Sequence, residues 1–397
     1  MQWKRDLLIG VDGTCWSNER GYGRFAREIV AAMVRLAPDD EFVCFVDEAS
    51  ARRFTITEPN SRAVIVAAST PASTAASAAG YRSPFDMLAM TRAVARTRLD
   101  VFFSPSVYTY FPLPPRLRAV VTIHDAIAER FPALTLPSLR SRVFWGLKMK
   151  LALHQATRVL TVSDYAASDV ARVHGVDPGL IDVATEAAAP AFRPRERGDI
   201  DSESSKAGVP TGAKWFIYVG GFNPHKNVPD IIRAHARVAA ACESDPPHLI
   251  LVGTLDRDVF HGDLAGAISA IDEVGTGELV HWTGFVPDEP LSALNSGAIA
   301  LLLLSAAEGF GLPAVEAAAC GTPVIATVES PLPQLLSGGG IFVAPGDHAG
   351  IAAAMERLAA DETLRRSMSA TALLRSADLT WVRGATAALA SLRRAAA

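Results

Sequence analysis

The chain has 397 residues, of which 49% are hydrophobic and 20% are charged, and its formal net charge is -4. This length suits two domains, and a chain without a basic excess is not expected to bind nucleic acid. Its longest apolar run, residues 298–307, is far shorter than the roughly 20 residues of a membrane-spanning helix.

Segments typical of strands and helices alternate through the first half of the chain. The helix-like segment 22–36 has one apolar stripe, formed by Phe25, Ile29, Met33 and Leu36. The predicted strands are nearly continuous apolar runs, as in strands buried on both faces, and they cover 7–12, 41–47, 101–105, 119–125 and 158–164. This alternation predicts a parallel sheet built from βαβ units.

The second half repeats this plan. Its predicted strands cover 215–221, 248–253, 278–284, 298–305, 323–327 and 341–345. A charged segment rich in serine and glycine lies between the halves and is interpreted as a linker. The expected divisions are an N-terminal domain over 1–195, a linker over 196–212, a second domain over 213–379 and a C-terminal helix over 380–397 that crosses back to the first domain. Ligands of open α/β sheets bind where strands end, so the function is expected in the loops that follow the strands.

The segment 305–327 is the most informative. A buried strand ends just before Glu308, and a helix is predicted from Leu312, with Pro313 at its favoured first position. Gly311 allows the backbone to approach a ligand closely, and the helix start offers N–H groups to sugar or phosphate oxygens. Glu308 and Glu316 stand seven residues apart as candidate acceptors for vicinal hydroxyls. Taken singly, Glu308 could instead cap the helix and Glu316 could be a solvated helix residue.

The motif as a whole resembles the E-x7-E signature of a large retaining glycosyltransferase family that includes sucrose synthases and bacterial mannosyltransferases. Further blocks match in the same order: VDGTCWSNERGYGRFAREIV, TIHDAI, TVSDYAASDV, GGFNPHKNV and HWTGFVPDEPL. The resemblance implies a GT-B fold, in which two doubly wound Rossmann-like domains face each other across a cleft. It also implies a nucleoside-diphosphate sugar donor, transfer with retention, and neither a cofactor nor a catalytic metal. The subgroup it resembles acts in polysaccharide assembly, which implies mannose from GDP-mannose and a glycan or lipid-linked acceptor.

The resemblance assigns the donor to the second domain. Lys226 is expected to neutralise the diphosphate and Glu316 to bind the ribose. Glu308 is expected to bind sugar hydroxyls, and the backbone N–H groups that assist it belong to Phe310, Gly311 and Leu312.

One position departs from the family pattern. Family members usually carry an arginine shortly before the lysine, but this chain has Gly221, Phe222 and Asn223 there. Gly221 and Asn223 are expected to belong to the donor loop. The second phosphate cation is not identified, and Arg24 and His225 are the candidates for it.

The first domain offers a second set of candidates. The resemblance places His124, which ends a predicted strand, beside the donor sugar, with Asp125 next to it. The alternatives are a buried histidine with satisfied hydrogen bonds and a helix-capping aspartate.

Two further loops follow strands of the first domain. Gly21, Gly23 and Arg24 are expected in a loop that reaches the phosphates or the acceptor, although Gly-Tyr-Gly is also a routine helix entrance. Ser163 either contributes to the site or caps its own helix.

Segment 139–158 is a basic amphipathic helix. It could lie on an anionic membrane, where lipid-linked acceptors are found, or be an ordinary surface helix. The four cysteines lack Cys-x-x-Cys spacing, so neither a zinc site nor a redox motif is expected, and a reducing compartment is favoured. We therefore expect a cytoplasmic protein, and peripheral contact with the inner membrane face through 139–158 is the alternative to an ordinary surface helix.

Three other functions compete with this assignment. A dinucleotide-dependent oxidoreductase would need G-x-G-x-x-G after the first strand, and GVDGTCWSNERGYG does not fit it. A GT-B phosphorylase would need a lysine site for pyridoxal phosphate, which is not apparent, and a GT-B epimerase belongs with it as an alternative. The third is a non-catalytic nucleotide-sugar-binding subunit, which the intact E-x7-E motif and Lys226 argue against.

Overall fold

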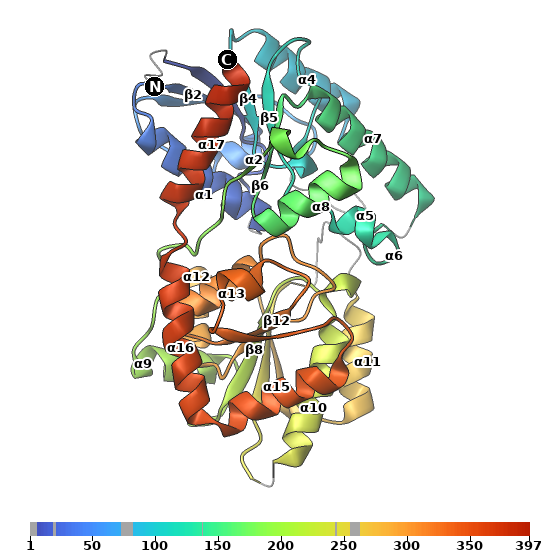
Figure 1. Cartoon of the computed structure of the whole chain (residues 1–397), viewed down its shortest axis with the longest axis vertical. Helices are drawn as coiled ribbons and strands as arrows, with labels where there is room; N and C mark the ends of the chain where they lie inside the picture. Colours follow the sequence, from blue (N-terminus) through green and yellow to red (C-terminus); the bar gives the residue numbers. More distant parts are fainter. Residues whose placement is uncertain (1–5, 19–20, 73–81, 137, 243, 255–262) are drawn as a thin grey trace. The chain divides into compact units, whose positions relative to one another are not determined.

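The computed structural model describes residues 6–18, 21–72, 82–136, 138–242, 244–254 and 263–397 (Figure 1). The chain forms two compact units. The first consists of Met1–Pro132, Leu136–Glu186 and Thr380–Ala397, and the second of Ala133–Thr135 and Ala187–Leu379. Within the described residues, no helix combines the length and apolar character needed to cross a bilayer.

A seven-stranded parallel sheet forms the middle of the first unit, in the order β3-β2-β1-β4-β5-β6-β7. Its strands are β1 (Leu8–Asp12), β2 (Glu41–Val46), β3 (Ser61–Ile65), β4 (Val101–Ser104), β5 (Ala119–Thr122), β6 (Arg158–Thr161) and β7 (Ile181–Val183). All five predicted strands are present. The sequence prediction missed β3 and β7, because both are edge strands without a continuous buried run.

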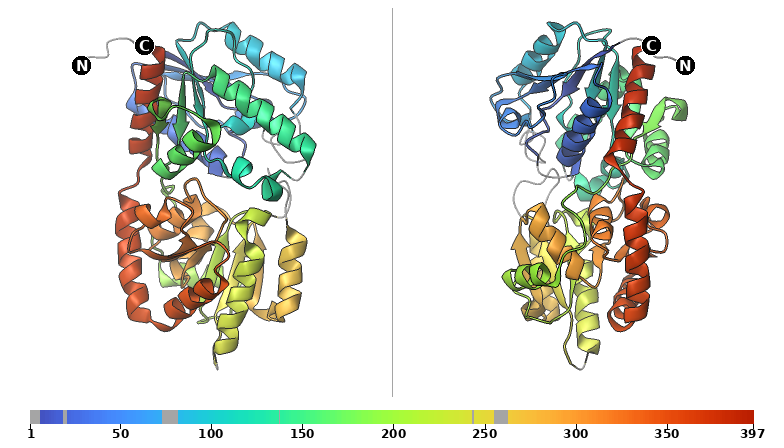
Figure 2. Two further views of the ribbon diagram at one scale, coloured as in Figure 1. Left: turned by 45° about the vertical axis from the view of Figure 1, so that its right-hand side comes forward. Right: turned by 90° about the vertical axis from the view of Figure 1, so that its left-hand side faces the viewer.

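Helices cover both faces of this sheet (Figures 1 and 2). They are α1 (Gly21–Leu36), α2 (Glu48–Ala51), α4 (Pro84–Ala95), η1 (Val107–Thr109), α5 (Ile127–Arg130), α7 (Leu139–Gln155), α8 (Asp164–His174), η2 (Pro178–Leu180) and α17 (Trp381–Ala396). Three of the four residues of the short helix α6 (Pro132–Thr135) belong to the second unit. One core packs Phe45 and Phe111 against Phe102, with ring centroids 6.2 and 5.9 Å apart. Burial of such side chains contributes about 1.5–3 kcal/mol each.

The C-terminal helix α17 belongs to the first unit, where it packs along α1 (Figure 2). Gly384 lies so close to the carbonyl of Thr185 that a larger residue would clash there. Arg393 and Arg394 then form ion pairs with Asp40 and Asp182 at 3.1 and 2.6 Å. The chain thus leaves the first unit after residue 186 and returns at residue 380.

The second unit is built on a six-stranded parallel sheet in the order β10-β9-β8-β11-β12-β13. The strands, all predicted from the sequence, are β8 (Trp215–Val219), β9 (His248–Val252), β10 (Val280–Gly284), β11 (Leu301–Leu303), β12 (Val324–Thr327) and β13 (Gly340–Val343). Its helices are α9 (Arg197–Lys206), η3 (Pro224–Lys226), α10 (Val228–Ala241), α11 (Leu264–Val274), η4 (Gly277–Leu279), α12 (Asp288–Gly297), α13 (Leu312–Ala319), α14 (Leu332–Leu335), α15 (His348–Ala360) and α16 (Glu362–Ala377).

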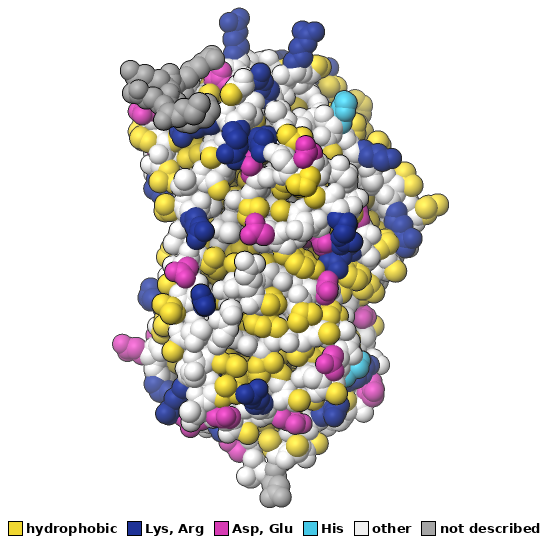
Figure 3. Space-filling model, viewed as in Figure 1, with side chains coloured by type: hydrophobic (Ala, Val, Ile, Leu, Met, Phe, Trp, Pro, Cys, Tyr) yellow, Lys and Arg dark blue, Asp and Glu magenta, His cyan; other side chains and the backbone are white. Residues whose placement is uncertain are grey.

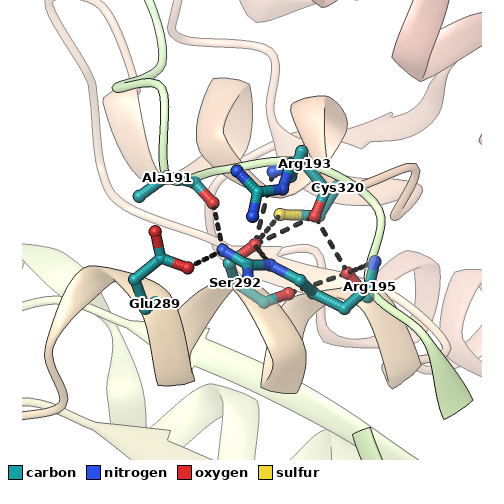
Figure 4. A network of polar contacts seen from close by, with 7 residues as sticks. Ala191, Arg193, Arg195, Glu289, Ser292 and Cys320 are labelled. Atoms are coloured by element: carbon teal, nitrogen blue, oxygen red, sulfur yellow. Dashed lines mark hydrogen bonds and ion pairs between the residues drawn. The ribbon is translucent and has the colours of Figure 1, made fainter. Parts of the chain in front are cut away.

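The interpretation of 196–212 as a linker is wrong, because this stretch contains α9, which packs against α12. Only Ile200 and Ser204 of α9 are buried, so its sequence lacks an apolar stripe that would reveal a helix. The preceding residues are also fixed to the second unit (Figure 4). The Ser292 hydroxyl on α12 donates to the carbonyl of Arg193 at 2.9 Å and accepts from Nε of Arg195 at 3.1 Å.

Both sheets reverse their strand order at one point. In the first unit the reversal lies between β1 and β4, and in the second between β8 and β11. Chains that leave such neighbouring strands turn to opposite faces of the sheet, which opens a crevice at the strand ends where ligands bind. A ligand is therefore expected to bind at the loops that follow these four strands.

Candidate functional site

The loops after β8 and β11 are held together at the reversal point of the second unit. The backbone N–H of Ala306 donates to the carbonyl of His225 at 2.8 Å, and the Asn227 amide donates to the carbonyl of Leu304 at 2.9 Å. Asn227 adopts a left-handed conformation with φ 54°, which asparagine tolerates better than most residues. These bonds fix the spacing between η3, which carries Lys226, and the turn that carries Glu308.

Lys226 and Glu308 meet in this crevice. The Lys226 Nζ atom lies 2.6 Å from Oε1 of Glu308, although 82 residues separate the two in sequence. The hydroxyl of Ser305 donates to the same carboxylate oxygen. Both side chains are mostly buried, at 19% and 11% exposure. A cation and an acceptor for hydroxyl groups are thus held side by side, which suits a ligand with adjacent phosphate and sugar groups.

Glu308 is followed by a tight turn into α13. Gly311 has φ 87°, and a Cβ atom there would lie 2.8 Å from Cδ1 of Leu332, so the position requires glycine. No side chain caps α13, which contradicts the interpretation of Glu308 as a helix cap. Phe310 and Leu312 on either side of Gly311 are buried. The turn presents the backbone N–H groups at the start of α13, where partial positive charge favours anionic or hydroxyl oxygens.

Glu316 lies in the second turn of α13 and is only 5% exposed. This burial excludes the alternative of a solvated helix residue. A buried carboxylate is costly unless it is hydrogen-bonded, so its presence in a helix of alanine, valine and leucine calls for a polar role.

The structure argues against His225 as the second phosphate cation. His225 is buried, and burial, with a smaller contribution from the Lys226 charge, lowers its pKa to about 3. The imidazole is therefore neutral near pH 7. Asn223 is buried at the start of η3, where its carbonyl accepts from the N–H of Lys226 at 2.8 Å. Gly221 accepts a hydrogen bond from the Tyr218 hydroxyl through its carbonyl, so both residues shape the loop that carries Lys226.

His124 stands at the end of β5 in the first unit. Its Nε2 atom lies 3.0 Å from the carbonyl of Pro105, so Nε2 carries the proton, and Nδ1 faces Oε1 of Glu186 at 3.6 Å. Phe25 packs edge-on against the ring at 4.9 Å. Glu186 is a buried carboxylate that the sequence analysis missed. The one feature of the sequence that could have indicated its burial is its position within an alanine-rich run.

The other predicted residues of the first unit have local structural roles. Asp125 accepts from the backbone N–H of Ile127 at 2.9 Å, at the start of α5. Ser163 caps α8 by accepting from the N–H of Ala166 at 3.0 Å. Ser163 is therefore a helix cap, as the alternative interpretation stated, whereas the N-cap residue of α5 is Ala126 and Asp125 stabilises the turn before this helix.

The expected loop at Gly21, Gly23 and Arg24 is wrong, because α1 begins at Gly21 and all three lie in its first turn. Gly23 packs against the carbonyl of Asn18, where a Cβ atom would clash. Gly23 thus allows the start of α1 to pack closely against the preceding backbone. The buried face of this helix already includes Tyr22, before the apolar stripe that begins at Phe25.

Comparison with known proteins identifies both units. Residues 199–375 match the family described as glycosyl transferases group 1, and residues 20–185 match Glycosyltransferase Family 4. The chain also shares its fold with a sucrose-phosphate synthase from Thermosynechococcus elongatus, at a TM-score of 0.75, 18% identity and 98% coverage of both chains. The protein is therefore a glycosyltransferase with a GT-B fold, and its two Rossmann-like units confirm the expected fold class.

Within this class, the chain is similar to two bacterial enzymes. It is 28% identical over 283 residues to the O-antigen chain mannosyltransferase B of Escherichia coli, which covers 71% of each chain. It is 27% identical over 240 residues to the O-antigen chain mannosyltransferase RfbU of Salmonella typhimurium, which covers 60% of each chain. The chain thus spans less than two thirds of the length of the second relative.

Proposed function

We propose that this glycosyltransferase moves mannose from GDP-mannose to a glycan or lipid-linked saccharide during polysaccharide assembly, with retention of configuration and without a metal. The observation that carries the proposal is the Lys226–Glu308 pair at the reversal point of the second sheet. The choice of mannose and of polysaccharide assembly follows the names of the two similar enzymes.

In this proposal the donor binds the second unit. Lys226 neutralises the diphosphate, and this charge counts most when the sugar–phosphate bond breaks and negative charge grows on the leaving group. Glu308 accepts hydrogen bonds from the sugar, assisted by the N–H groups at the start of α13, and Glu316 binds the ribose hydroxyls. From the first unit, we propose His124 as a further catalytic residue with a positioned imidazole. These contacts hold the reacting carbon in one orientation, which lowers the barrier through positioning.

We assign the reaction to front-face displacement. The acceptor hydroxyl attacks the anomeric carbon on the side from which the nucleoside diphosphate leaves, and the leaving phosphate oxygen takes the hydroxyl proton. This route retains configuration without a covalent enzyme intermediate. Among the described residues, no three histidine, cysteine or acidic side chains are grouped as a metal site would require. In this proposal the positive charge near the leaving group comes from Lys226.

We further propose that α7 contacts an anionic membrane. Its outer face exposes Leu139, Val143, Phe144, Leu147 and Leu151, of which Leu139 is 78% and Phe144 is 59% exposed. Basic side chains accompany them, and residues 139–158 include no acidic residue. Hydrophobic and basic side chains lie over this helix at the edge of the first unit (Figure 3). Apolar and polar side chains do not separate onto opposite faces of α7, so the expectation of an amphipathic helix at 139–158 is wrong. The proposed contact depends instead on the exposed apolar side chains together with the basic ones, which anionic bilayers attract.

Flotation with phosphatidylglycerol vesicles tests the membrane proposal. The double variant Phe144→Ser, Leu147→Ser should lose binding, whereas Leu374→Ser, which changes an equally exposed leucine on α16, should not. Equal flotation of all three proteins would refute the contact.

A radiolabelled donor panel with GDP-, UDP- and dTDP-sugars tests the proposed function. GDP-mannose should stabilise the protein in thermal shifts and should label an acceptor fraction with EDTA present, because binding raises native-state stability by RT ln(1 + [L]/Kd). Turnover that EDTA abolishes and magnesium restores would refute the metal-free mechanism. Donor binding without turnover by any acceptor fraction would favour a non-catalytic binding subunit.

A further inference from the structure

We propose that the reversal point of the first sheet contains a phosphate-binding subsite, in which Arg82 and Lys148 hold a phosphate group carried by the acceptor. The inference rests on the proposed function, since it names a chemical feature of the acceptor that this function requires. Arg82 belongs to no motif of the sequence, and Lys148 was noted only as part of the basic segment 139–158; the two lie 66 positions apart.

Both cations point to one turn. The Arg82 guanidinium donates to the carbonyl of Thr109, and the Lys148 ammonium donates to the carbonyl of Tyr108 at 3.1 Å. These are consecutive carbonyls of η1, the turn that follows β4. The hydroxyl of Thr109 donates to Oδ2 of Asp12 at 3.0 Å, and Asp12 ends β1. The pair therefore stands where β1 and β4 diverge, which is the position at which doubly wound sheets bind ligands.

Aromatic rings flank the cations. The Tyr108 ring lies between Tyr22 and Trp145, with centroids 5.2 and 5.4 Å away. The Lys148 ammonium is 5.5 Å from the centroid of Trp145, and Arg82 stacks over Phe111 at 5.2 Å. These rings exclude water and orient the two positive charges, which raises the strength of a charge-assisted hydrogen bond.

The two positive charges lack close counter-charges. Among the described residues, neither Arg82 nor Lys148 forms an ion pair with a carboxylate within 4.0 Å. Both are partly buried. Burial lowers the pKa of Lys148 to about 8, and the charge of Arg82 acts in the same direction. Burial also lowers the pKa of Arg82, whereas Asp12, Asp47 and Asp86 raise it from longer range.

The neighbouring acidic groups are committed elsewhere. Asp12 accepts from Thr14 and Thr109, and burial raises its pKa. Asp86 accepts from Ser69, and Asp47 caps α2. Glu129 accepts from the indole of Trp145 at 2.6 Å and lies 3.6 Å from Nε2 of His174, while Asp125 accepts from the N–H of Ile127.

A phosphate group fits this arrangement better than a neutral sugar does. Two partly buried cations that donate to consecutive carbonyls repel each other, and a phosphate dianion offsets both charges. The guanidinium fork and the ammonium group are also the side chains that most often bind phosphate oxygens. Lys148 lies on the inner face of α7, whose outer face carries the exposed apolar side chains. A lipid-linked phosphate is therefore the favoured source, with a soluble sugar phosphate as the alternative.

The first experiment follows Lys148 directly. The chain has only six lysines, so reductive ¹³C-methylation gives a spectrum that single substitutions can assign. We expect the Lys148 signal to titrate near pH 8 in the full chain without ligand and to shift upward by about one pKa unit with inorganic pyrophosphate. The Lys150 signal, from the exposed face of the same helix, should not move. An unchanged Lys148 pKa at saturating pyrophosphate would overturn the inference.

The second experiment measures binding. Pyrophosphate titrations use Lys226→Ala as the background, which removes the donor-side cation, and add Lys148→Gln, Arg82→Gln or Lys150→Gln. We expect about tenfold weaker binding for the first two and less than twofold change for the last, because one charge-assisted hydrogen bond contributes about 1.5–3 kcal/mol. Lys148→Arg keeps the charge and should retain most of the affinity, which separates charge from a folding defect. Equal affinities across the set would refute the subsite.

Comparing ligands identifies the source of the phosphate. A lipid-linked acceptor is supported if geranyl pyrophosphate binds wild type more tightly than inorganic pyrophosphate does, and if the two bind Phe144→Ser with equal affinity. Equal affinity of both would support a soluble phosphate ester. Donor turnover is measured in parallel with the wild-type chain. If GDP-mannose is hydrolysed or transferred but Arg82 and Lys148 bind no phosphate, the subsite is wrong and the proposed function stands.

Discussion

Replacement of Lys226 by alanine probes the feature on which the donor site depends. This change removes the ammonium group 2.6 Å from Glu308 but leaves the carboxylate its hydrogen bond from Ser305. If Lys226 stabilises charge on the leaving phosphate, its loss should lower kcat by about 10²–10³, equivalent to about 2.7–4 kcal/mol of transition-state stabilisation. The KM for the donor should rise less, because the charge matters most as the bond breaks.

The fold should largely tolerate this change. The pair is 19% and 11% exposed, so it keeps some contact with water, and we expect about 1–3 kcal/mol of destabilisation from the remaining buried carboxylate. Circular dichroism and urea unfolding establish that the variant is folded before kinetics are compared. Lys214→Ala is the matched control, since Lys214 is an exposed lysine just before β8 in the same unit.

The assay is a full donor saturation curve for wild type, Lys226→Ala and Lys214→Ala at fixed acceptor. A kcat near that of wild type for Lys226→Ala would refute both the phosphate role and the assignment of the loop after β8 to the donor. A loss that appears equally in Lys214→Ala would point to a general charge effect instead.

Three further predictions concern other parts of the second unit. Glu316→Ala should raise the donor KM with a smaller change in kcat, because the ribose contact exists in ground and transition states alike. With a donor that lacks the ribose hydroxyls, steady-state kinetics should give wild type and Glu316→Ala the same KM. Gly311→Ala should lower the unfolding free energy by about 1–3 kcal/mol in urea melts, because φ is 87° and the new methyl group meets Leu332; a change of a few tenths would contradict this. The pKa values of His225 and His235 are lowered to about 3 and about 4, below that of an unfolded histidine, so the unfolded state binds more protons. The free energy of unfolding should therefore decrease as the pH is lowered below about 6.5, by up to about 1.4 kcal/mol for each pH unit and each histidine. In urea unfolding at several pH values, His225→Asn should make this pH dependence weaker.

The sequence was informative wherever one local pattern decides the structure. Continuous apolar runs revealed all six strands of the second sheet, and the Glu308–Glu316 spacing around a helix start revealed the donor turn. The edge strand β3 was missed because its residues are exposed or half-buried and show no apolar run. Helix α9 was missed because a single aliphatic side chain, Ile200, anchors it.

Convergence of distant residues could not be predicted in the same way. Nothing near Arg82 or Lys148 in the sequence indicates that both donate to consecutive carbonyls of η1. Their meeting depends on the parallel pairing of β1 with β4, which brings η1 to the edge of the sheet. The role of Glu186 beside His124 is hidden for the same reason, since 62 residues separate them.

The return of α17 to the first unit has a consequence for synthesis. Residues Trp381, Leu389 and Leu392 of this helix are buried against the first unit, yet they are translated after the whole of the second unit. During synthesis, the face of α1 that packs against α17 stays exposed until about 190 further residues have been added. At 5–20 residues per second this takes about 10–40 s. The second unit, continuous from residue 187 to 379 apart from one short segment, can fold first. The earlier-made half of this enzyme is therefore the half that finishes folding last.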